Sequence, residues 1–300
     1  MVKVLLDKIK KFDKDTRKPI LNFLYLDGFL EADLKVVQDR VLNHNDFWLL
    51  ILDGRPGTGK STLGTQIACR LNQTHSINSI CFNLEQFEHV LKSANEGDVV
   101  VLDEAFELNV RSSQSRANLR ILSLLQQARE KKIFVILILV CTYDLDKNVV
   151  LSLCDYFIHC WREPFGPRGQ YNAYDPDGLK NLYLWGRQTR SYSYKIAKAI
   201  YPGRFTKNFV LDYLEYRKKK ITTLESTRKN AAKKQASSFI RKAERNKIIR
   251  SMHAKGINVD KICDMLDIQK SAIYKILKEH YTKVIEIEEG AYQNETETTT

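Results

Sequence analysis

The strongest constraint on the fold lies in residues 47–61, where a run of apolar side chains leads into a glycine-rich loop. The run from Phe47 to Leu52 is too short for a free-standing helix and is typical of a buried strand. The loop reads Gly54-Arg55-Pro56-Gly57-Thr58-Gly59-Lys60-Ser61. Because glycines carry no side chain, successive backbone N–H groups can turn inward and hold an anion. The stretch therefore predicts a strand followed by a phosphate-binding loop.

The residues after the loop support this interpretation over a chance match. Leu63, Ile67 and Leu71 follow at helical spacing. A helix of about residues 60–71 would point its positive N-terminal end at bound phosphates. Lys60 would reach the β- and γ-phosphates, and the Ser61 hydroxyl would ligate Mg²⁺. We therefore predict ATP and Mg²⁺ as cofactors, bound by Gly54, Arg55, Pro56, Gly57, Thr58, Gly59, Lys60, Ser61 and Thr62.

Strand-like and helix-like runs alternate through residues 47–161, which favours a parallel α/β sheet with flanking helices. Besides 47–52, we expect strands at about 79–82, 98–103, 134–141 and 156–161, and helices at 84–93, 115–131 and 145–153. The longest apolar run, Ile133–Cys141, is too short to cross a bilayer and suits a central strand. The six cysteines form no C-x-x-C pair, and the N-terminus shows no secretory signal. These features predict a cytoplasmic protein without membrane contact.

A second group of candidate catalytic residues follows the apolar strand Val99–Leu102. Asp103 would hold Mg²⁺ through water, and Glu104 would orient the attacking water, which would make the chain an NTP hydrolase. Such sites commonly use a cation to stabilise the charge on the transferred phosphoryl group. The local candidates are Arg111, Arg116, Arg120 and Arg129, of which we take Arg116 and Arg129 as catalytic, on their own site or on a neighbour's.

The flanking segments differ in composition. Residues 1–46 are charged and have helix-like spacing at Ile20–Phe29 and Leu34–Leu42, which predicts an N-terminal helical segment. Residues 162–212 are rich in glycine, proline and tyrosine and suggest a β-rich appendage with a hairpin of Gln170–Tyr174 and Leu182–Trp185. That appendage would cover a sheet edge. The alternative is a nucleic-acid or subunit contact through Arg187, Arg190 and Tyr192.

Most of the chain's formal charge of +12 comes from one segment. Between Tyr213 and Arg250 there are thirteen Lys or Arg residues against three Glu. We interpret 213–240 as a basic linker helix that attracts phosphate backbones; a solvated spacer is the alternative. The last residues, 283–300, are acidic and end in threonines, which is the composition of a disordered tail.

Residues 241–282 recover a helical period and predict a small all-α domain. One helix would contain Ile248, Ile249 and Met252; a second, capped by Asn258, would carry Ile262; a third would start at Gln269. Two short helices joined by a tight turn and braced by a third are typical of a helix-turn-helix, and the stretch resembles the DNA-binding units of resolvases and transposases. A bundle used for protein contacts is the alternative. The expected contacts to double-stranded DNA are Gln269, Lys270, Ser271, Tyr274 and Lys275.

Gly54–Ser61, Asp103-Glu104 and the polar end of the 134–141 strand resemble the additional-strand, catalytic-glutamate class of P-loop ATPases. That class includes RecA-like motors, FtsK–HerA translocases, viral DNA-packaging ATPases and AAA+ proteins. The resemblance implies that the 134–141 strand lies between the phosphate-loop strand and the Asp103 strand, and that Thr142 is the sensor of the γ-phosphate. FtsK–HerA proteins usually have Gln at this point, where this chain has Cys141-Thr142. The habits of the class also imply a homo-oligomer, with a hexameric ring as one form.

Together these features predict a DNA-binding ATPase that couples hydrolysis to assembly on DNA or to its movement, as in packaging, segregation, conjugation or transposition. One alternative is an ATP-gated regulator or replication-initiation switch with slow hydrolysis. Another is a small-molecule kinase, which is weakened by Glu104 and by the helix-turn-helix, since such enzymes do not need the former and rarely carry the latter.

Overall fold

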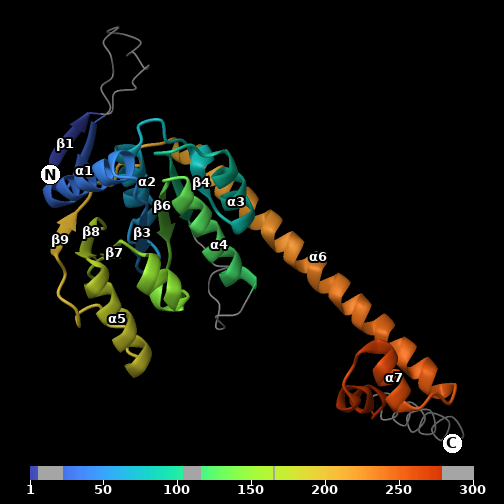
Figure 1. Cartoon of the computed structure of the whole chain (residues 1–300). Helices are drawn as coiled ribbons and strands as arrows, with labels where there is room; N and C mark the ends of the chain where they lie inside the picture. The colour runs from blue at the N-terminus through green and yellow to red at the C-terminus, as the bar shows by residue number, and fades with distance from the viewer. Residues whose placement is uncertain (6–22, 104–115, 165, 279–300) are drawn as a thin grey trace, which may run out of the picture. The chain divides into compact units, whose positions relative to one another are not determined.

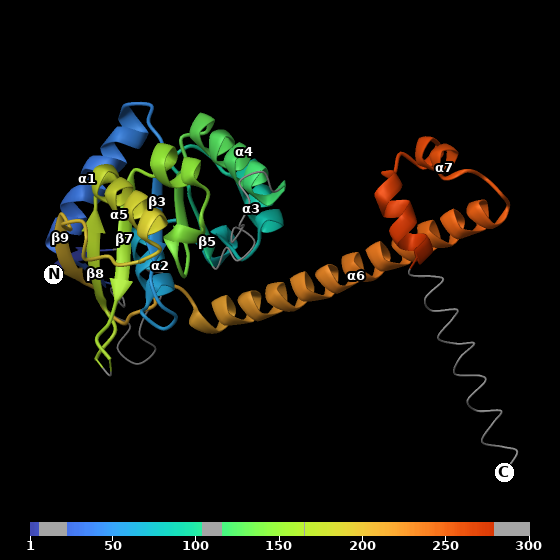
Figure 2. The ribbon, with the colours of Figure 1, turned by 90° about the horizontal axis from the view of Figure 1, so that it is seen from below.

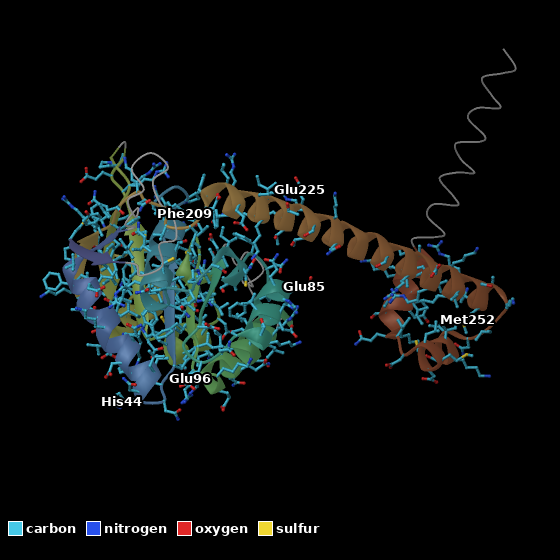
Figure 3. The ribbon with its side chains drawn as sticks, turned by 90° about the horizontal axis from the view of Figure 1, so that it is seen from above. His44, Glu85, Glu96, Phe209, Glu225 and Met252 are labelled. Atoms are coloured by element: carbon cyan, nitrogen blue, oxygen red, sulfur yellow. The ribbon has the colours of Figure 1, made fainter. Side chains whose placement is uncertain are left out.

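The computed structural model describes residues 1–5, 23–103, 116–164 and 166–278 (Figure 1). The chain divides into two compact units, Met1–Glu225 and Ser226–Thr300. The long helix α6 (Tyr213–Ala254) begins in the first unit and ends in the second; Glu225 and Met252 mark these two parts of it in Figure 3. Within the described ranges, no helix is both long enough and apolar enough to span a bilayer.

The first unit is built on a seven-stranded sheet of order β4-β5-β6-β3-β7-β8-β9. The four pairings from β4 to β7 are parallel, and β8 and β9 add antiparallel strands at one edge. β6 pairs with both β3 and β5, which is the order that the resemblance implies. The bounds are β3 (Trp48–Asp53), β4 (Ile80–Cys81), β5 (Val99–Asp103), β6 (Phe134–Ile138), β7 (Tyr156–Trp161), β8 (Gln170–Tyr174) and β9 (Tyr201–Arg204).

Helices cover both faces of this sheet, so that β3 is buried along its whole length (Figure 2). Leu50 and Leu52 face a core shared with α1 (Gly28–Asn43) and α2 (Lys60–Leu71). Leu49 and Ile51 face a second core shared with α3 (Leu84–Ser93), α4 (Arg116–Glu130) and α5 (Pro176–Thr189). Burial on two faces explains why the strand is a continuous apolar run rather than an alternating one. The expected α/β sheet with flanking helices is therefore confirmed.

Two flanking predictions need correction. The N-terminal segment is not wholly helical, because β1 (Val2–Leu5) pairs antiparallel with β2 (Phe23–Leu26) where a helix was expected. Leu182–Trp185 is not a strand but part of α5. Asp175 accepts a hydrogen bond from the Gly178 N–H, and Pro176 occupies the first turn, so a strong N-terminal cap starts a helix there. The antiparallel partner of β8 is β9 instead.

The second unit packs the end of α6, α7 (Val259–Leu266) and a further helical stretch at 270–278 around a small apolar core. Asn258 caps α7, since its side chain accepts a hydrogen bond from the Asp260 N–H. Asp267 adopts a left-handed conformation (φ 51°) and ends α7, so the turn to the last helix is short. The core side chains are Ile249, Val259, Ile262, Ile273, Ile276 and Leu277.

Candidate nucleotide site

The glycine-rich loop leaves the carboxyl end of β3 in a conformation that its glycines make possible. Gly54 has φ +137°, and a Cβ there would lie 2.0 Å from the carbonyl oxygen of Cys160. Gly59 has φ +98°, and a Cβ there would lie 2.9 Å from the ring of Phe205. Residues with side chains rarely adopt such φ values. The loop is thus held close to β7 and to the segment after β9.

Lys60 is the first residue of α2 and is 9% exposed. Its Nζ donates to the carbonyl oxygens of Gly54 at 2.7 Å and of Arg55 at 3.1 Å. Thr58 Oγ1 donates to the same Arg55 oxygen at 2.9 Å. The ammonium group therefore spans the loop, at the positive end of α2, where an anion would be bound.

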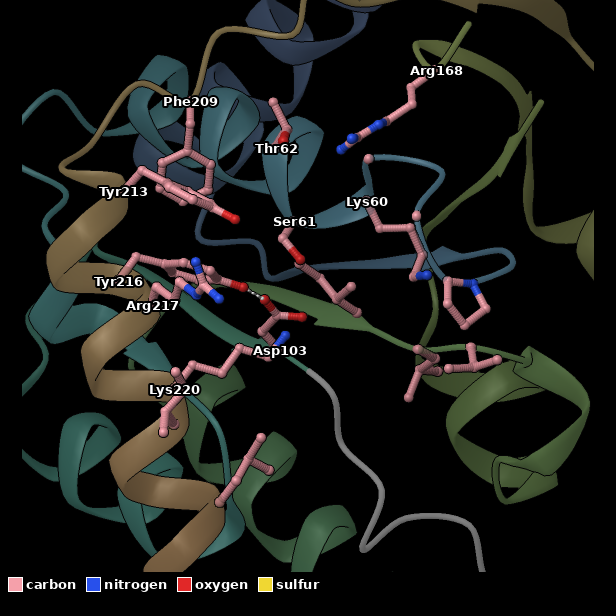
Figure 4. A pocket seen from close by; sticks show the side chains of 18 residues that line it. Lys60, Ser61, Thr62, Asp103, Arg168, Phe209, Tyr213, Tyr216, Arg217 and Lys220 are labelled. Carbon is pink, nitrogen blue, oxygen red and sulfur yellow. Dashed lines mark hydrogen bonds between the residues drawn. The ribbon is translucent and has the colours of Figure 1, made fainter. Parts of the chain in front are cut away.

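The loop forms one wall of a cavity of about 470 Å³. Asp103 at the end of β5 and the residues after β6 form its floor, and the first turns of α6 form the opposite wall (Figure 4). Arg168, from the β7–β8 connection, also reaches it. The full lining is Pro56, Gly57, Gly59, Lys60, Ser61, Thr62, Asp103, Ile138, Leu139, Val140, Arg168, Phe209, Tyr213, Tyr216, Arg217, Lys220, Ile221 and Leu224.

Ser61 and Asp103 both line this cavity. A hydroxyl and a carboxylate are hard oxygen donors, the kind that Mg²⁺ prefers. Asp103 is fully buried, and its Oδ2 accepts a hydrogen bond from the hydroxyl of Tyr216. The residues present therefore fit a magnesium ion bound together with nucleotide phosphates. Glu104, the expected catalytic base, lies outside the described residues.

Thr142 does not line the cavity, which corrects its expected position as a sensor. Its hydroxyl donates to Asp53 Oδ2 at 2.8 Å, and its N–H donates to the same oxygen at 3.1 Å. Asp53 also lies 2.7 Å from His159 Nδ1 and accepts from the Tyr194 hydroxyl. β6 ends at Ile138, and the following residues turn away before Thr142 is reached. The sequence shows a polar residue near the strand end but not the direction in which it points.

The expected arginines also lie away from the cavity where they are described. Arg129 is in the last turn of α4, near Asp155, whose pKa is raised by burial and lowered in part by that arginine. Arg120 forms an ion pair with Glu88 (Nη2 to Oε2, 2.5 Å). Arg111 and the side chain of Arg116 lie outside the described part of the chain. The cations that line the cavity beside Lys60 are Arg168, Arg217 and Lys220, which sequence reasoning missed.

The start of α6 is fixed to the sheet unit by buried side chains. Gln66 on α2 donates from Nε2 to the carbonyl oxygens of Thr206 (3.1 Å) and Asn208 (2.7 Å). Lys219 Nζ donates to the carbonyl oxygens of Ile77 (2.9 Å) and Ile80 (2.7 Å). The first part of the expected basic linker is therefore a wall of the cavity, and residues up to Glu225 belong to the first unit.

The expected DNA-contact residues lie in the second unit. Gln269, Lys270, Ser271, Tyr274 and Lys275 are all exposed, whereas Ile273 and Leu277 face its core. Lys270 Nζ lies 2.7 Å from Asp260 Oδ1, a pair in which both side chains are more than half exposed. An exposed pair of this kind contributes little to stability and leaves the lysine accessible.

Comparisons with known proteins point in the same direction as the geometry. Residues 37–147 match the family model described as Novel STAND NTPase 3, a range that includes the loop and Asp103. No curated protein matches the chain. The region around the loop is similar to NTPases.

Three solved structures illustrate the likeness to P-loop NTPases. The genome packaging NTPase B204 from Sulfolobus turreted icosahedral virus 2, in complex with ATP-gammaS, is 17% identical, with 46% of this chain and 96% of that chain covered and a TM-score of 0.33. The N-terminal domain of zonular occludens toxin from Neisseria meningitidis is 17% identical, with 43% and 84% covered and a TM-score of 0.33. The AAA domain of FIGL-1 in complex with ADP is 14% identical, with 57% and 77% covered and a TM-score of 0.31.

Proposed function

We propose that this chain is a magnesium-dependent ATPase whose nucleotide cycle acts on double-stranded DNA. The observation that carries the proposal is the cavity that joins Lys60, Ser61 and Asp103 at the carboxyl ends of β3 and β5. In α/β sheets this edge is where ligands bind. The same cavity is lined by three further cations, which suit the charge of a triphosphate.

The proposed chemistry divides the work among the lining residues. The loop N–H groups, Lys60 and the N-terminus of α2 would bind the phosphates, and Ser61 and Asp103 would hold the metal. Glu104, the next residue after Asp103, would orient water for attack on the γ-phosphate. Arg217 and Lys220, on one face of α6, would stabilise the charge that develops on the transferred group. This assignment replaces Arg116 and Arg129 as cations acting on their own site and leaves them a role on a neighbouring copy.

The DNA part of the proposal rests on residue type and exposure in the second unit. Tyr274, Lys275 and the neighbouring polar residues are exposed on the helix that follows a short turn. Lysines would contact phosphates, and Gln269 and Ser271 would reach base edges. The basic segment between Tyr213 and Arg250 would add salt-sensitive affinity. The processes that use such an activity include packaging, segregation, conjugation and transposition of DNA.

Steady-state ATP hydrolysis with and without double-stranded DNA tests the enzymatic proposal. Wild-type protein should hydrolyse ATP in a magnesium-dependent way, and DNA should stimulate turnover. Lys60→Ala should abolish nucleotide binding, whereas Glu104→Gln should retain binding and lose turnover. Arg55→Ala, an exposed residue of the same loop, is the matched control and should change turnover little. Absence of nucleotide binding in the wild-type protein would overturn the proposal.

DNA binding is tested separately by fluorescence anisotropy with a labelled duplex at several salt concentrations. Lys275→Ala should weaken binding about tenfold and reduce the salt dependence. Lys198→Ala, an exposed lysine of the first unit, is the control and should leave the affinity unchanged. Equal affinity of both variants would instead favour a second unit that contacts protein.

One observation favours a second candidate, an ATP-gated DNA-binding switch with slow hydrolysis. Helix α6 begins as a wall of the nucleotide cavity and ends in the unit that carries the candidate DNA-contact residues. Tight ATP binding with negligible turnover, even on DNA, would support the switch over the motor. Sedimentation with ATP and DNA tests the expected homo-oligomer, including a hexameric ring, and a monomer under all conditions would exclude it.

A further inference from the structure

Tyr216 connects the first turns of α6 to the carboxylate that would serve the metal. Its hydroxyl donates a hydrogen bond to Asp103 Oδ2 (Figure 4). Its ring is 5% exposed and packs on Phe82 and Phe209, with ring centroids 5.4 Å and 4.8 Å away. Lys220 Nζ lies 5.8 Å from the centre of the same ring. The hydroxyl is therefore held in place at Asp103 by the packing of the aromatic ring.

The burial of Asp103 bears on how a metal could reach it. Asp103 has 0% relative exposure, so a sphere of the size of a water molecule does not touch it. A magnesium ion keeps several of its waters, and a carboxylate of this kind accepts hydrogen bonds from those waters. A water can reach Asp103 only if the groups that cover it move. The hydroxyl bonded directly to the carboxylate is one of these groups.

We propose that Tyr216 is a latch that magnesium and nucleotide open together: the Tyr216 hydroxyl holds Asp103 in the nucleotide-free protein and leaves it when the loaded site needs that carboxylate. The inference rests on the proposed ATPase function. It names Tyr216 as a nucleotide-sensing residue and the first turns of α6 as the element that responds. The nucleotide state would thus be passed from the metal site to a helix rather than only to the phosphate loop.

Other contacts of α6 determine how far such a response extends. Lys219 donates to the Ile77 and Ile80 carbonyl oxygens, and Thr223 Oγ1 accepts from Gln86 Nε2 at 2.8 Å. None of these partners lies in the loop or beside Asp103 in sequence, so nucleotide has no direct reason to break these contacts. Release of Tyr216 would therefore loosen the helix start, while the following turns keep their place on the sheet unit.

The test replaces the hydroxyl and keeps the ring, as Tyr216→Phe. Tyr213→Phe is the matched control, because Tyr213 lines the same cavity from the same helix and is 54% exposed. Calorimetry with a non-hydrolysable ATP analogue measures affinity at a series of magnesium concentrations and in EDTA. Hydrogen–deuterium exchange of the backbone amides of residues 213–224, with and without the analogue, measures the state of the helix start. Thermal unfolding checks that both variants fold.

If Tyr216 competes with the loaded site, Tyr216→Phe should reach half-saturation at about tenfold less magnesium than wild type, because a hydrogen bond to a charged group no longer has to be broken. Amides of 213–224 in the wild type should exchange faster when magnesium and the analogue are bound, and those of Tyr216→Phe should exchange fast without them. Tyr213→Phe should behave as wild type in both measurements.

Two results would overturn the latch. A higher magnesium requirement in Tyr216→Phe would mean that the hydroxyl positions Asp103 for the metal instead of competing with it. Unchanged affinity together with unchanged exchange would mean a contact without a role in the nucleotide cycle. Either result leaves the ATPase proposal standing, since wild-type binding is intact. If the wild type binds no magnesium and analogue at all, the proposed function itself fails.

Discussion

The two walls of the nucleotide cavity are built in different ways. The phosphate-loop wall consists of neighbours in sequence, and its shape depends on the absence of side chains at Gly54 and Gly59. The α6 wall brings together side chains that are far from the loop in sequence, among them Tyr216 and Arg217. The first wall is fixed by backbone conformation, and the second is fixed by side-chain contacts.

This difference teaches which changes each wall should tolerate. The loop wall should fail when atoms are added, because a Cβ has no room at its close approaches. The α6 wall should fail when atoms are removed or donors are inverted, because its hydrogen bonds hold it to the sheet. Substitutions of similar size on the two walls should therefore have opposite rankings for gain and loss of volume.

The largest effect should come from adding one methyl group to the loop. Gly54→Ala places a Cβ against the Cys160 carbonyl at a φ of +137°, and should lower the free energy of unfolding by about 4 kcal/mol. Gly57→Ala, with φ +80° and no atom within 4 Å, should cost about 1 kcal/mol. Gly28→Ala, in ordinary contact with Val2, is the control and should change stability by less than about 0.5 kcal/mol. Denaturant unfolding of the three variants measures the series, and equal losses at Gly54 and Gly57 would contradict the steric explanation.

A buried histidine at the start of β5, the end away from Asp103, separates the stability of the fold from that of either wall. Burial lowers the pKa of His75 to about 4, although the Val99 carbonyl, 3.1 Å from Nδ1, and Asp98 raise it in part. The folded chain therefore keeps this histidine neutral, and its contribution is complete above the unfolded pKa of about 6.5. As the pH falls from about 6.5 to 4, the unfolded chain gains a proton that the folded chain lacks, so stability should fall by up to about 3 kcal/mol.

Thermal unfolding as a function of pH measures this effect. His75→Gln should remove much of the slope between pH 6.5 and 4, whereas the exposed His89→Gln should leave it as in the wild type. Nucleotide affinity per folded molecule should not follow the same profile, because His75 lines neither wall. A common profile for stability and affinity would show that this edge of the sheet and the cavity are coupled.

The α6 wall should be sensitive to an exchange of nearly equal size. Gln66 is fully buried and donates to oxygens of Thr206 and Asn208 in the segment before α6. Gln66→Glu replaces that donor by a second acceptor facing acceptors, and should cost about 2 kcal/mol of stability. Gln126→Glu, exposed on α4, is the matched control. Chemical denaturation compares the two, and a neutral Gln66→Glu would mean that the segment before α6 is not held by this side chain.

The same contrast explains what the sequence could predict. The phosphate loop, the buried strands and Ser61 with Asp103 follow from patterns within a few neighbouring residues, and the structure places them in one cavity. Leu182–Trp185 has the composition of a strand, but the Asp175-Pro176 cap and burial of Leu179 and Leu182 on one side make it helical. The Thr142 direction depends on where β6 ends, and Arg168, Arg217 and Lys220 depend on contacts between distant segments. No local pattern encodes either kind of information.

The smallest expected effect concerns charge on the α6 wall. Arg217 lines the cavity one residue from Tyr216, and its side chain would approach the γ-phosphate only when the triphosphate is bound. Arg217→Ala should therefore reduce turnover about tenfold, or about 1.4 kcal/mol in the barrier, while the affinity for the ground-state nucleotide changes less. Lys218→Ala, an exposed neighbour outside the cavity, should leave turnover unchanged. Single-turnover hydrolysis separates the two effects, because it measures the chemical step apart from binding. Equal loss of affinity and turnover would make Arg217 a binding residue, and the α6 wall would then resemble the loop wall in acting on the ground state.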